Sequence, residues 1–137
     1  MVYVYDSSFV GSLIITDEKN TRVNKLHASI GEDDDILVPQ MFWYEITNIF
    51  MDLIRRKRYT YDDVYQFFSP LAALRLVCDN ESGINYASKL LRLCDEYNIS
   101  SYDAAYLELA ERKKAVLCTM DENLKIAAKK YGVSVIK

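Results

Sequence analysis

The sequence contains few of the residues that build the commonest catalytic sites. Its 137 residues include one histidine, three cysteines, four glycines and two prolines. A metal-free ribonuclease that works through paired histidines is therefore excluded. The four glycines form no Walker-type loop, no G-x-G-x-x-G fingerprint and no G-x-S-x-G elbow, so nucleotide-binding and serine-hydrolase motifs are excluded as well.

The scarce cysteines and the single histidine also argue against a zinc site. Cys78, Cys94 and Cys118 are odd in number, far apart and never spaced as C-x-x-C. This spacing is typical neither of a disulfide framework nor of a zinc cluster, and we interpret the three as small buried hydrophobic residues. His27 falls in a helical apolar pattern, and we interpret it as a packed or surface residue.

Long hydrophobic runs are missing too. No stretch approaches the roughly 20 apolar residues of a membrane span, and the first residues carry no basic leader. We therefore expect a cytoplasmic protein without a membrane partner. With a net charge of -3, the chain does not have the excess of basic residues that is typical of a passive nucleic-acid binder. Basic clusters at 55–58 and 112–114 end helical patterns, where pairing with a helix C-terminus and contact with phosphate are both open explanations.

Half of the residues are hydrophobic, and their pattern alternates between two periods. Short β-branched or aromatic runs predict strands at 2–5, 36–38, 74–77, 115–119 and 133–136. Helical periodicity separates them, at 8–15, 18–30, 40–57, 60–70, 81–97, 101–113 and 121–131. Such alternation predicts the α/β class, as a three-layer α/β/α sandwich with a central, mostly parallel sheet. No linker or repeat divides the chain, so we expect one domain over residues 1–137.

One aspartate stands on the apolar face of a predicted helix. In "ISSYDAAYLELAERKKA", Asp103 lies in line with Leu107 and Ala110, whereas Glu108 falls on the opposite, solvent-facing side. We interpret Tyr106, which flanks the apolar stripe, as a packing residue. Ser100 followed by Asp103 resembles a capping box, so a cap is an open alternative to a functional role.

Three further acids occupy comparable places. Asp6 directly follows a predicted strand, and Asp121 comes two residues after another, at the strand ends where sites gather in open α/β sheets, although each also suits a helix N-cap. Glu45 shares a narrow polar sector of the 40–57 helix with Asn48 and Asp52. That sector faces either water or a polar cleft. The rest of this helix is apolar and is expected to pack on the body or on a second subunit, through Trp43, Tyr44, Phe50 and Met51.

A shared explanation for the four acids is that they converge on a metal ion. Carboxylates about 5 Å apart repel by roughly 3 kcal/mol per pair at an effective dielectric near 20, so a cluster of them calls for a cation. Oxygen ligands favour Mg²⁺ or Mn²⁺ over zinc. The sequence thus predicts a site for one or two such ions at Asp6, Glu45, Asp103 and Asp121.

The same segments resemble a known family. "VYDSS", "VPQMFWYEITNIF", "SSYDAAYLELAERKKAVLCTMDENL" and "AAKKYGVSVI" are similar to the PIN-domain ribonucleases, especially VapC-type toxins, over nearly the whole chain. The resemblance implies that the four acids form the catalytic metal site of an endoribonuclease. It also implies supporting or substrate-side roles for a few polar residues near them, namely Ser7, Asn48 and Thr119. One departure is Asn123, which stands where some members carry a further acid.

The resemblance also implies partners. These are an RNA substrate, a second copy of the chain in a homodimer, and a cognate VapB-type antitoxin that covers the groove and places a basic side chain near the acids. The apolar 40–57 helix independently suggests an interface, which a charged substitution at Trp43 or Phe50 is expected to weaken. An alternative from another class is a catalytically silent PIN-like module whose acids are caps and whose role is to bind protein.

Overall fold

The centre of the molecule is a four-stranded parallel sheet with the first strand inside it. The structure is a computed structural model that describes residues 1–15 and 20–136. Its strands are β1 (Val2–Tyr5), β2 (Asp35–Val38), β3 (Val77–Cys78) and β4 (Val116–Cys118), in the order β3-β2-β1-β4. Val4 and Tyr5 are fully buried because helices cover both faces of the sheet.

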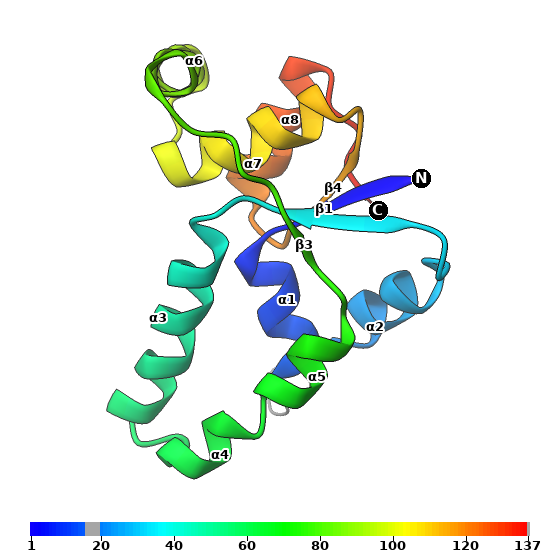
Figure 1. Cartoon of the computed structure of the whole chain (residues 1–137), viewed down its shortest axis with the longest axis vertical. Helices are drawn as coiled ribbons and strands as arrows, with labels where there is room; N and C mark the ends of the chain where they lie inside the picture. The colour runs from blue at the N-terminus through cyan, green and yellow to red at the C-terminus, as the bar shows by residue number, and fades with distance from the viewer. Residues whose placement is uncertain (16–19, 137) are drawn as a thin grey trace.

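Two helical layers enclose the sheet and confirm the predicted α/β/α sandwich (Figure 1). On one side lie α1 (Ser7–Ile14), α2 (Thr21–Ala28), α3 (Phe42–Arg55), α4 (Tyr61–Tyr65) and α5 (Phe68–Ala73). On the other side lie α6 (Ile84–Tyr97), α7 (Ser101–Arg112) and α8 (Glu122–Tyr131). Of the predicted helix 18–30, residues 18 and 19 lie outside the described part of the chain.

Three predicted elements differ from the structure by more than a shift of their ends. The strand predicted at 133–136 is a single parallel bridge between Leu117 and Val135. The strand predicted at 74–77 starts only at Val77, because α5 extends to Ala73 and Arg75 adopts a left-handed conformation with φ of 54°. The predicted 60–70 helix is two helices, and Pro70 lies in the first turn of the second, where no intrahelical N–H is needed.

Glu108 was expected to face solvent and is instead buried, with 1% of its surface exposed. Its carboxylate accepts hydrogen bonds from Lys89 Nζ at 3.1 Å and Arg112 Nε at 2.9 Å. Arg112 also donates two hydrogen bonds to Asp79, at 2.6 and 3.2 Å. Because α6 covers this face of α7, the network replaces water as the partner of the carboxylate. It ties α6, α7 and the segment after β3 together.

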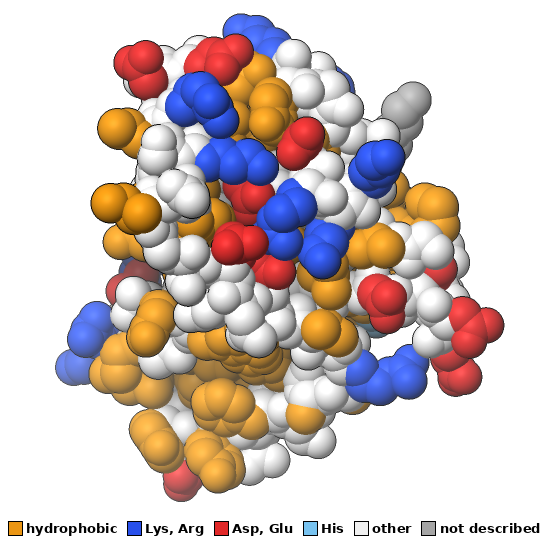
Figure 2. All heavy atoms as spheres, turned by 45° about the horizontal axis from the view of Figure 1, so that its top comes forward, with side chains coloured by type: hydrophobic (Ala, Val, Ile, Leu, Met, Phe, Trp, Pro, Cys, Tyr) orange, Lys and Arg blue, Asp and Glu red, His pale blue; other side chains and the backbone are white. Residues whose placement is uncertain are grey.

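Helix α3 divides its aromatic residues between core and surface. Phe50 is 3% exposed and contacts the rings of Phe67 and Phe68 at 5.6 and 5.7 Å. Trp43, by contrast, is 38% exposed, and Tyr44 and Met51 are exposed as well. Hydrophobic side chains gather on the lower part of the face shown in Figure 2, below a region rich in charged side chains. Phe50 is therefore a core residue, and only the exposed residues of α3 are available to a partner.

The remaining singled-out residues have ordinary packing roles. Cys118 is buried, whereas Cys78 and Cys94 are only half-buried, so the buried interpretation holds for one of the three. His27 is half-buried, and its Nδ1 lies 2.8 Å from the Tyr5 hydroxyl. Within the described residues, no helix combines the length and the apolar character that crossing a bilayer requires.

Candidate active site

The four predicted acids lie on four different elements near the carboxyl ends of β1 and β4. Asp6 follows β1 and caps α1, and Asp121 comes soon after β4 and caps α8. The two strands are parallel neighbours, and the Asp6 N–H donates to the Cys118 carbonyl at 3.1 Å. Glu45 and Asp103 are in the first turns of α3 and α7. The caps proposed for Asp6 and Asp121 are real, but they leave carboxylate lone pairs unused.

Asp6 is the most enclosed of these acids, with 5% of its surface exposed. One oxygen accepts hydrogen bonds from Phe9 N at 2.9 Å and Ser8 Oγ at 2.7 Å, and the other accepts one from Thr119 Oγ1. The pKa of Asp6 is raised to about 6, mainly by burial and to a smaller extent by the charge of Glu45, against the opposing effect of these hydrogen bonds. The structure thus holds a carboxylate in a place that disfavours its ionised form.

Two hydroxyl groups join the ends of β1 and β4. Thr119 is buried; it donates to Asp6 and accepts the Asp121 N–H at 3.0 Å. Ser8 donates to Asp6 and accepts the Met120 N–H at 3.0 Å. Each hydroxyl therefore fixes Asp6 against the segment that leads into Asp121.

Glu45 is held by the two other helices that face it. Its Oε1 accepts a hydrogen bond from the Tyr106 hydroxyl at 2.6 Å and one from Ser7 Oγ at 3.1 Å. Burial raises the pKa of Tyr106, and the hydrogen bond to Glu45 adds to this, so the hydroxyl remains a donor. Residues of α1, α3 and α7 thus meet at a single carboxylate.

Asp103 has only half of a capping box. Ser100 Oγ accepts the Asp103 N–H at 3.1 Å, as the cap interpretation requires. The described chain shows no reciprocal bond from the Ser100 N–H to the Asp103 carboxylate, whereas Thr60 and Asp63 make both bonds in α4. The pKa of Asp103 is raised to about 6, mainly by burial and then by the negative charges of Asp121 and Glu45. Its carboxylate therefore serves no cap and lies in the field of two other acids.

The donor chemistry fits a hard divalent cation, although the side chains are not closed around one. All four groups supply oxygen. The negative charge of Glu45 raises the pKa of Asp6, and the charges of Asp121 and Glu45 raise the pKa of Asp103. Among the described residues, however, no three acidic, imidazole or thiol groups lie close enough to share an ion. The acids form an electrostatic cluster, and binding a common ion would require their side chains to turn toward it.

The other predicted polar residues differ in their positions. Ser7 and Thr119 contact acids directly, as described above. Asn48 is exposed on α3, one turn beyond Glu45. Asn123 is exposed on α8; its backbone N–H donates to Asp121 Oδ1 at 2.9 Å. The structure brings Asn123, but not Asn48, into hydrogen-bond contact with an acid of the cluster.

Sequence analysis did not identify Ser8 and Tyr106 as site residues. Ser8 follows the predicted Ser7, and a second hydroxyl beside an acid that caps a helix is the signal that was available. Tyr106 is three residues after Asp103 and therefore shares its helix face. Because a tyrosine on an apolar face packs well without any polar role, spacing alone did not distinguish the two interpretations.

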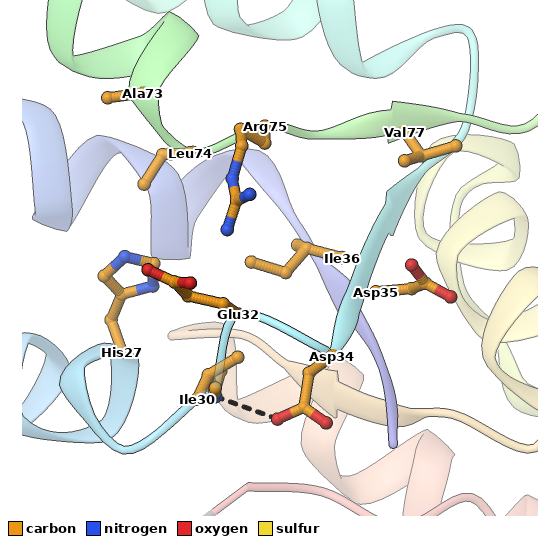
Figure 3. Close-up of a pocket in the computed structure, with 11 residues that line it drawn as sticks. His27, Ile30, Glu32, Asp34, Asp35, Ile36, Ala73, Leu74, Arg75 and Val77 are labelled. Atoms are coloured by element: carbon orange, nitrogen blue, oxygen red, sulfur yellow. Dashed lines mark hydrogen bonds between the residues drawn. The ribbon is translucent and has the colours of Figure 1, made fainter.

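Two hollows in the surface differ in their relation to the acids. One, of about 670 Å³, is a groove between the α6–α7 connection and α8, and Asp103 and Asp121 belong to its lining. The other, of about 270 Å³, lies at the amino ends of β2 and β3 and contains none of the four acids. Arg75 and Glu32 point into the second hollow from opposite sides (Figure 3). Only the first is continuous with the acid cluster.

Comparisons with known proteins agree with this architecture. Residues 3–130 match the family model of the PIN domain. No curated protein sequence matches the chain at a significant level. Among solved structures, PAE2754 from Pyrobaculum aerophilum is 18% identical, with a TM-score of 0.73 over 98% of this chain and 89% of that one.

Two further structures have informative descriptions. VapC20 from Mycobacterium tuberculosis, described as a sarcin-ricin loop cleaving toxin, is 16% identical, with a TM-score of 0.66 over 93% of this chain and 95% of that one. VapBC2 from Rickettsia felis, bound to a DNA fragment from its promoter, is 14% identical, with a TM-score of 0.69 over 99% and 98%. At these identities the likeness shows a shared fold.

Proposed function

Because the chain belongs to the PIN-domain family, we propose that it is a metal-dependent endoribonuclease and the toxin of a toxin–antitoxin pair. The observation that carries this proposal is the gathering of four acids from separate elements, with the pKa of Asp103 raised by burial and then by Asp121 and Glu45. A protein gains nothing in stability from such repulsion, so a cation is its natural complement.

In this proposal Asp6, Glu45, Asp103 and Asp121 hold one or two Mg²⁺ or Mn²⁺ ions. When bound, such an ion activates water and offsets charge on the scissile phosphate. The chain's own residues provide the orientation. The hydroxyl groups of Ser8 and Thr119 donate hydrogen bonds to Asp6, and those of Tyr106 and Ser7 donate to Glu45. These bonds hold the two carboxylates in position.

The test is cleavage of single-stranded RNA with Mg²⁺ or Mn²⁺ by the wild type, Asp103→Asn and a control, Asp52→Asn, whose carboxylate is exposed on α3. We expect Asp103→Asn to lose at least a hundredfold in rate and the control to stay within twofold. Calorimetric titration of Mn²⁺ gives a second readout, with saturable binding to the wild type and much weaker binding to Asp103→Asn. Cleavage that persists in excess EDTA would overturn the metal mechanism.

A second candidate function is a silent protein-binding module, and one observation favours it. The described side chains do not converge on a single ion, and Asn123 adds no negative charge. This candidate predicts no saturable Mn²⁺ binding and a correctly folded protein that cleaves no RNA. The same titration therefore decides between the two.

The exposed apolar surface and the structural relatives support the partners that we propose. We place a homodimer contact on the exposed residues of α3, Trp43 and Tyr44. VapBC2 supports a cognate antitoxin of the VapB type, which would cover the groove and direct a basic side chain at the acids. A guanidinium satisfies paired carboxylates with two parallel hydrogen bonds, so it competes with a metal ion for the same oxygens.

A further inference from the structure

The groove beside the acids has a polar wall on each side. Residues of α8 form one wall, and the end of α6 with the following loop forms the other. Its volume of about 670 Å³ lies within the range of pockets that take small molecules or single nucleotides. Since Asp103 and Asp121 line its inner end, whatever occupies the groove lies next to the acid cluster.

The α8 wall presents one stripe of residues that leads away from the acids. Asn123, Ala127 and Lys130 follow one another at helical spacing and all line the groove. From Asp121 to Lys130 the helix rises roughly 13 Å, at about 1.5 Å per residue. The stripe therefore places an amide close to the acids and an ammonium group about two turns farther out.

Lys130 is the cation of this groove. No ion pair to Lys130 is found in the described part of the chain, although Lys125 on the same helix pairs with Glu122 at 3.1 Å. Lys129 and Lys130 both lie in the last turn of α8, where they complement the helix dipole equally well. Only Lys130 lines the groove, so the dipole does not account for its position there.

The opposite wall carries groups suited to a base. Asn98 ends α6 in a left-handed conformation, with φ of 52°, and lines the groove across from α8. Asparagine amides read the edges of unpaired bases, and a lysine binds the backbone phosphate without regard to sequence. Glu96, which also lines the groove, opposes a polyanion there.

We propose that this groove seats the RNA nucleotide beside the scissile phosphate, with Lys130 binding a flanking phosphate and the amides of Asn123 and Asn98 contacting the base from the two walls. This inference takes its RNA substrate from the proposed function. What it adds is the direction in which the RNA strand runs away from the acids. An acidic protein that binds RNA needs such a local cation, because its overall charge of -3 repels the backbone.

Binding is measured first, without cleavage, by fluorescence anisotropy of a labelled single-stranded RNA. The variants are made in the Asp6→Asn background, since Asp6 does not line the groove. We expect Lys130→Gln to weaken binding about tenfold for every sequence tested. The slope of log affinity against log salt concentration should decrease by the amount expected for about one lost phosphate contact. The matched control, Lys129→Gln, should stay within twofold, and Glu96→Gln should tighten binding.

Cleavage by the same variants, with Asp6 restored, separates the two proposals. We expect Lys130→Gln to raise KM about tenfold with kcat within twofold, and Asn123→Ala to change the preference among bases. If Lys130→Gln and Lys129→Gln have equal effects while the wild type cleaves RNA, the groove proposal is wrong and the nuclease proposal is retained. If RNA binding depends on Lys130 but no RNA is cleaved, the nuclease proposal is wrong and RNA binding in the groove is retained. If no RNA binds at all, both proposals are wrong.

Discussion

The Tyr106 hydroxyl donates a 2.6 Å hydrogen bond to Oε1 of Glu45, which joins α7 to α3 across the acid cluster. Tyr106 is 1% exposed, so its ring is enclosed by the core although its hydroxyl reaches the half-buried Glu45. The ring belongs to the core and the hydroxyl belongs to the site.

Tyr106→Phe tests this dual role, because it keeps the ring and removes the donor. We expect a loss of about 1–2 kcal/mol in the free energy of unfolding, since a hydrogen bond to a charged group disappears. RNA cleavage and Mn²⁺ affinity should fall by about 10- to 100-fold, as expected when the orientation of a ligand is lost. Tyr102→Phe, on an exposed tyrosine of the same helix, is the control. Unchanged Mn²⁺ affinity in Tyr106→Phe would refute the positioning role.

The pKa of Asp6 predicts how stability depends on pH. In an unfolded chain the pKa of aspartate is about 3.9, and in the fold that of Asp6 is about 6, so the folded state holds the proton more tightly. Its contribution is most favourable below about pH 4 and is lost as the pH rises through 6, on the order of 3 kcal/mol in total. Asp103 acts in the same direction.

Denaturant unfolding in EDTA should therefore show a more stable protein at pH 5 than at pH 8. Asp6→Asn should flatten this dependence and raise stability at pH 8, because the buried charge is gone. Saturating Mn²⁺ at pH 8 should stabilise the wild type and leave Asp6→Asn nearly unaffected. A wild type that loses stability on going from pH 8 to pH 5 would contradict the assignment.

Thr119 offers a paired substitution at the junction of β1 and β4. Thr119→Val leaves the Asp121 N–H without its acceptor and takes one hydrogen bond from Asp6, at a cost of about 1–3 kcal/mol. Thr119→Ser retains the hydroxyl and should recover most of the stability and of the cleavage rate. If the serine variant is as impaired as the valine variant, the methyl group matters and the hydroxyl does not.

The buried network at Glu108 predicts a large structural effect away from the acids. Glu108→Gln removes the charge shared by Lys89 and Arg112, and we expect a loss of about 2–3 kcal/mol in thermal or denaturant unfolding. Glu111→Gln is the matched control, because its side chain is 46% exposed and its 3.9 Å pair with Lys89 contributes little. Equal effects of the two variants would show that burial does not strengthen the network.

The homodimer is tested on the exposed part of α3. Trp43→Glu should shift the protein toward monomer in light scattering at tens of micromolar, without loss of stability. Tyr102→Glu, on α7, should leave the mass unchanged. Phe50, the other residue that sequence reasoning proposed for this test, is unsuitable because a charge in the core would unfold the chain. A monomeric wild type would refute the dimer.

Strands and helices with a strong period were predictable, and their exceptions have local causes. β1 was predicted with its observed bounds, since Val2–Tyr5 is a short β-branched and aromatic run. The run at 133–136 is equally suitable for a strand, but the structure pairs it with β4 through one bridge only. Glu108 illustrates the limit of a helical wheel, which shows the face of a residue but not whether another helix covers it.

For the site, the order of the predicted elements placed the four acids in one region, and their chemistry led to the hypothesis that they share a cation. What the sequence did not reveal is which groups hold them. Ser8 and Tyr106 act through contacts 112 and 61 residues away along the chain, and no spacing rule reports such pairs. The capping box at Ser100 was also half right, since only the geometry shows that the Asp103 carboxylate is left out of it.

The order of the strands has a consequence for the cell that makes this protein. The first acid follows β1, and the neighbouring strand β4 is the last of the four described strands in chain order. Asp6 and Asp121 therefore cannot meet while translation is still in progress before residue 121. A nascent chain or fragment that ends before residue 121 contains no complete acid cluster. For the nuclease proposed above, the acid cluster would therefore assemble only after β4 and the start of α8 have been synthesised.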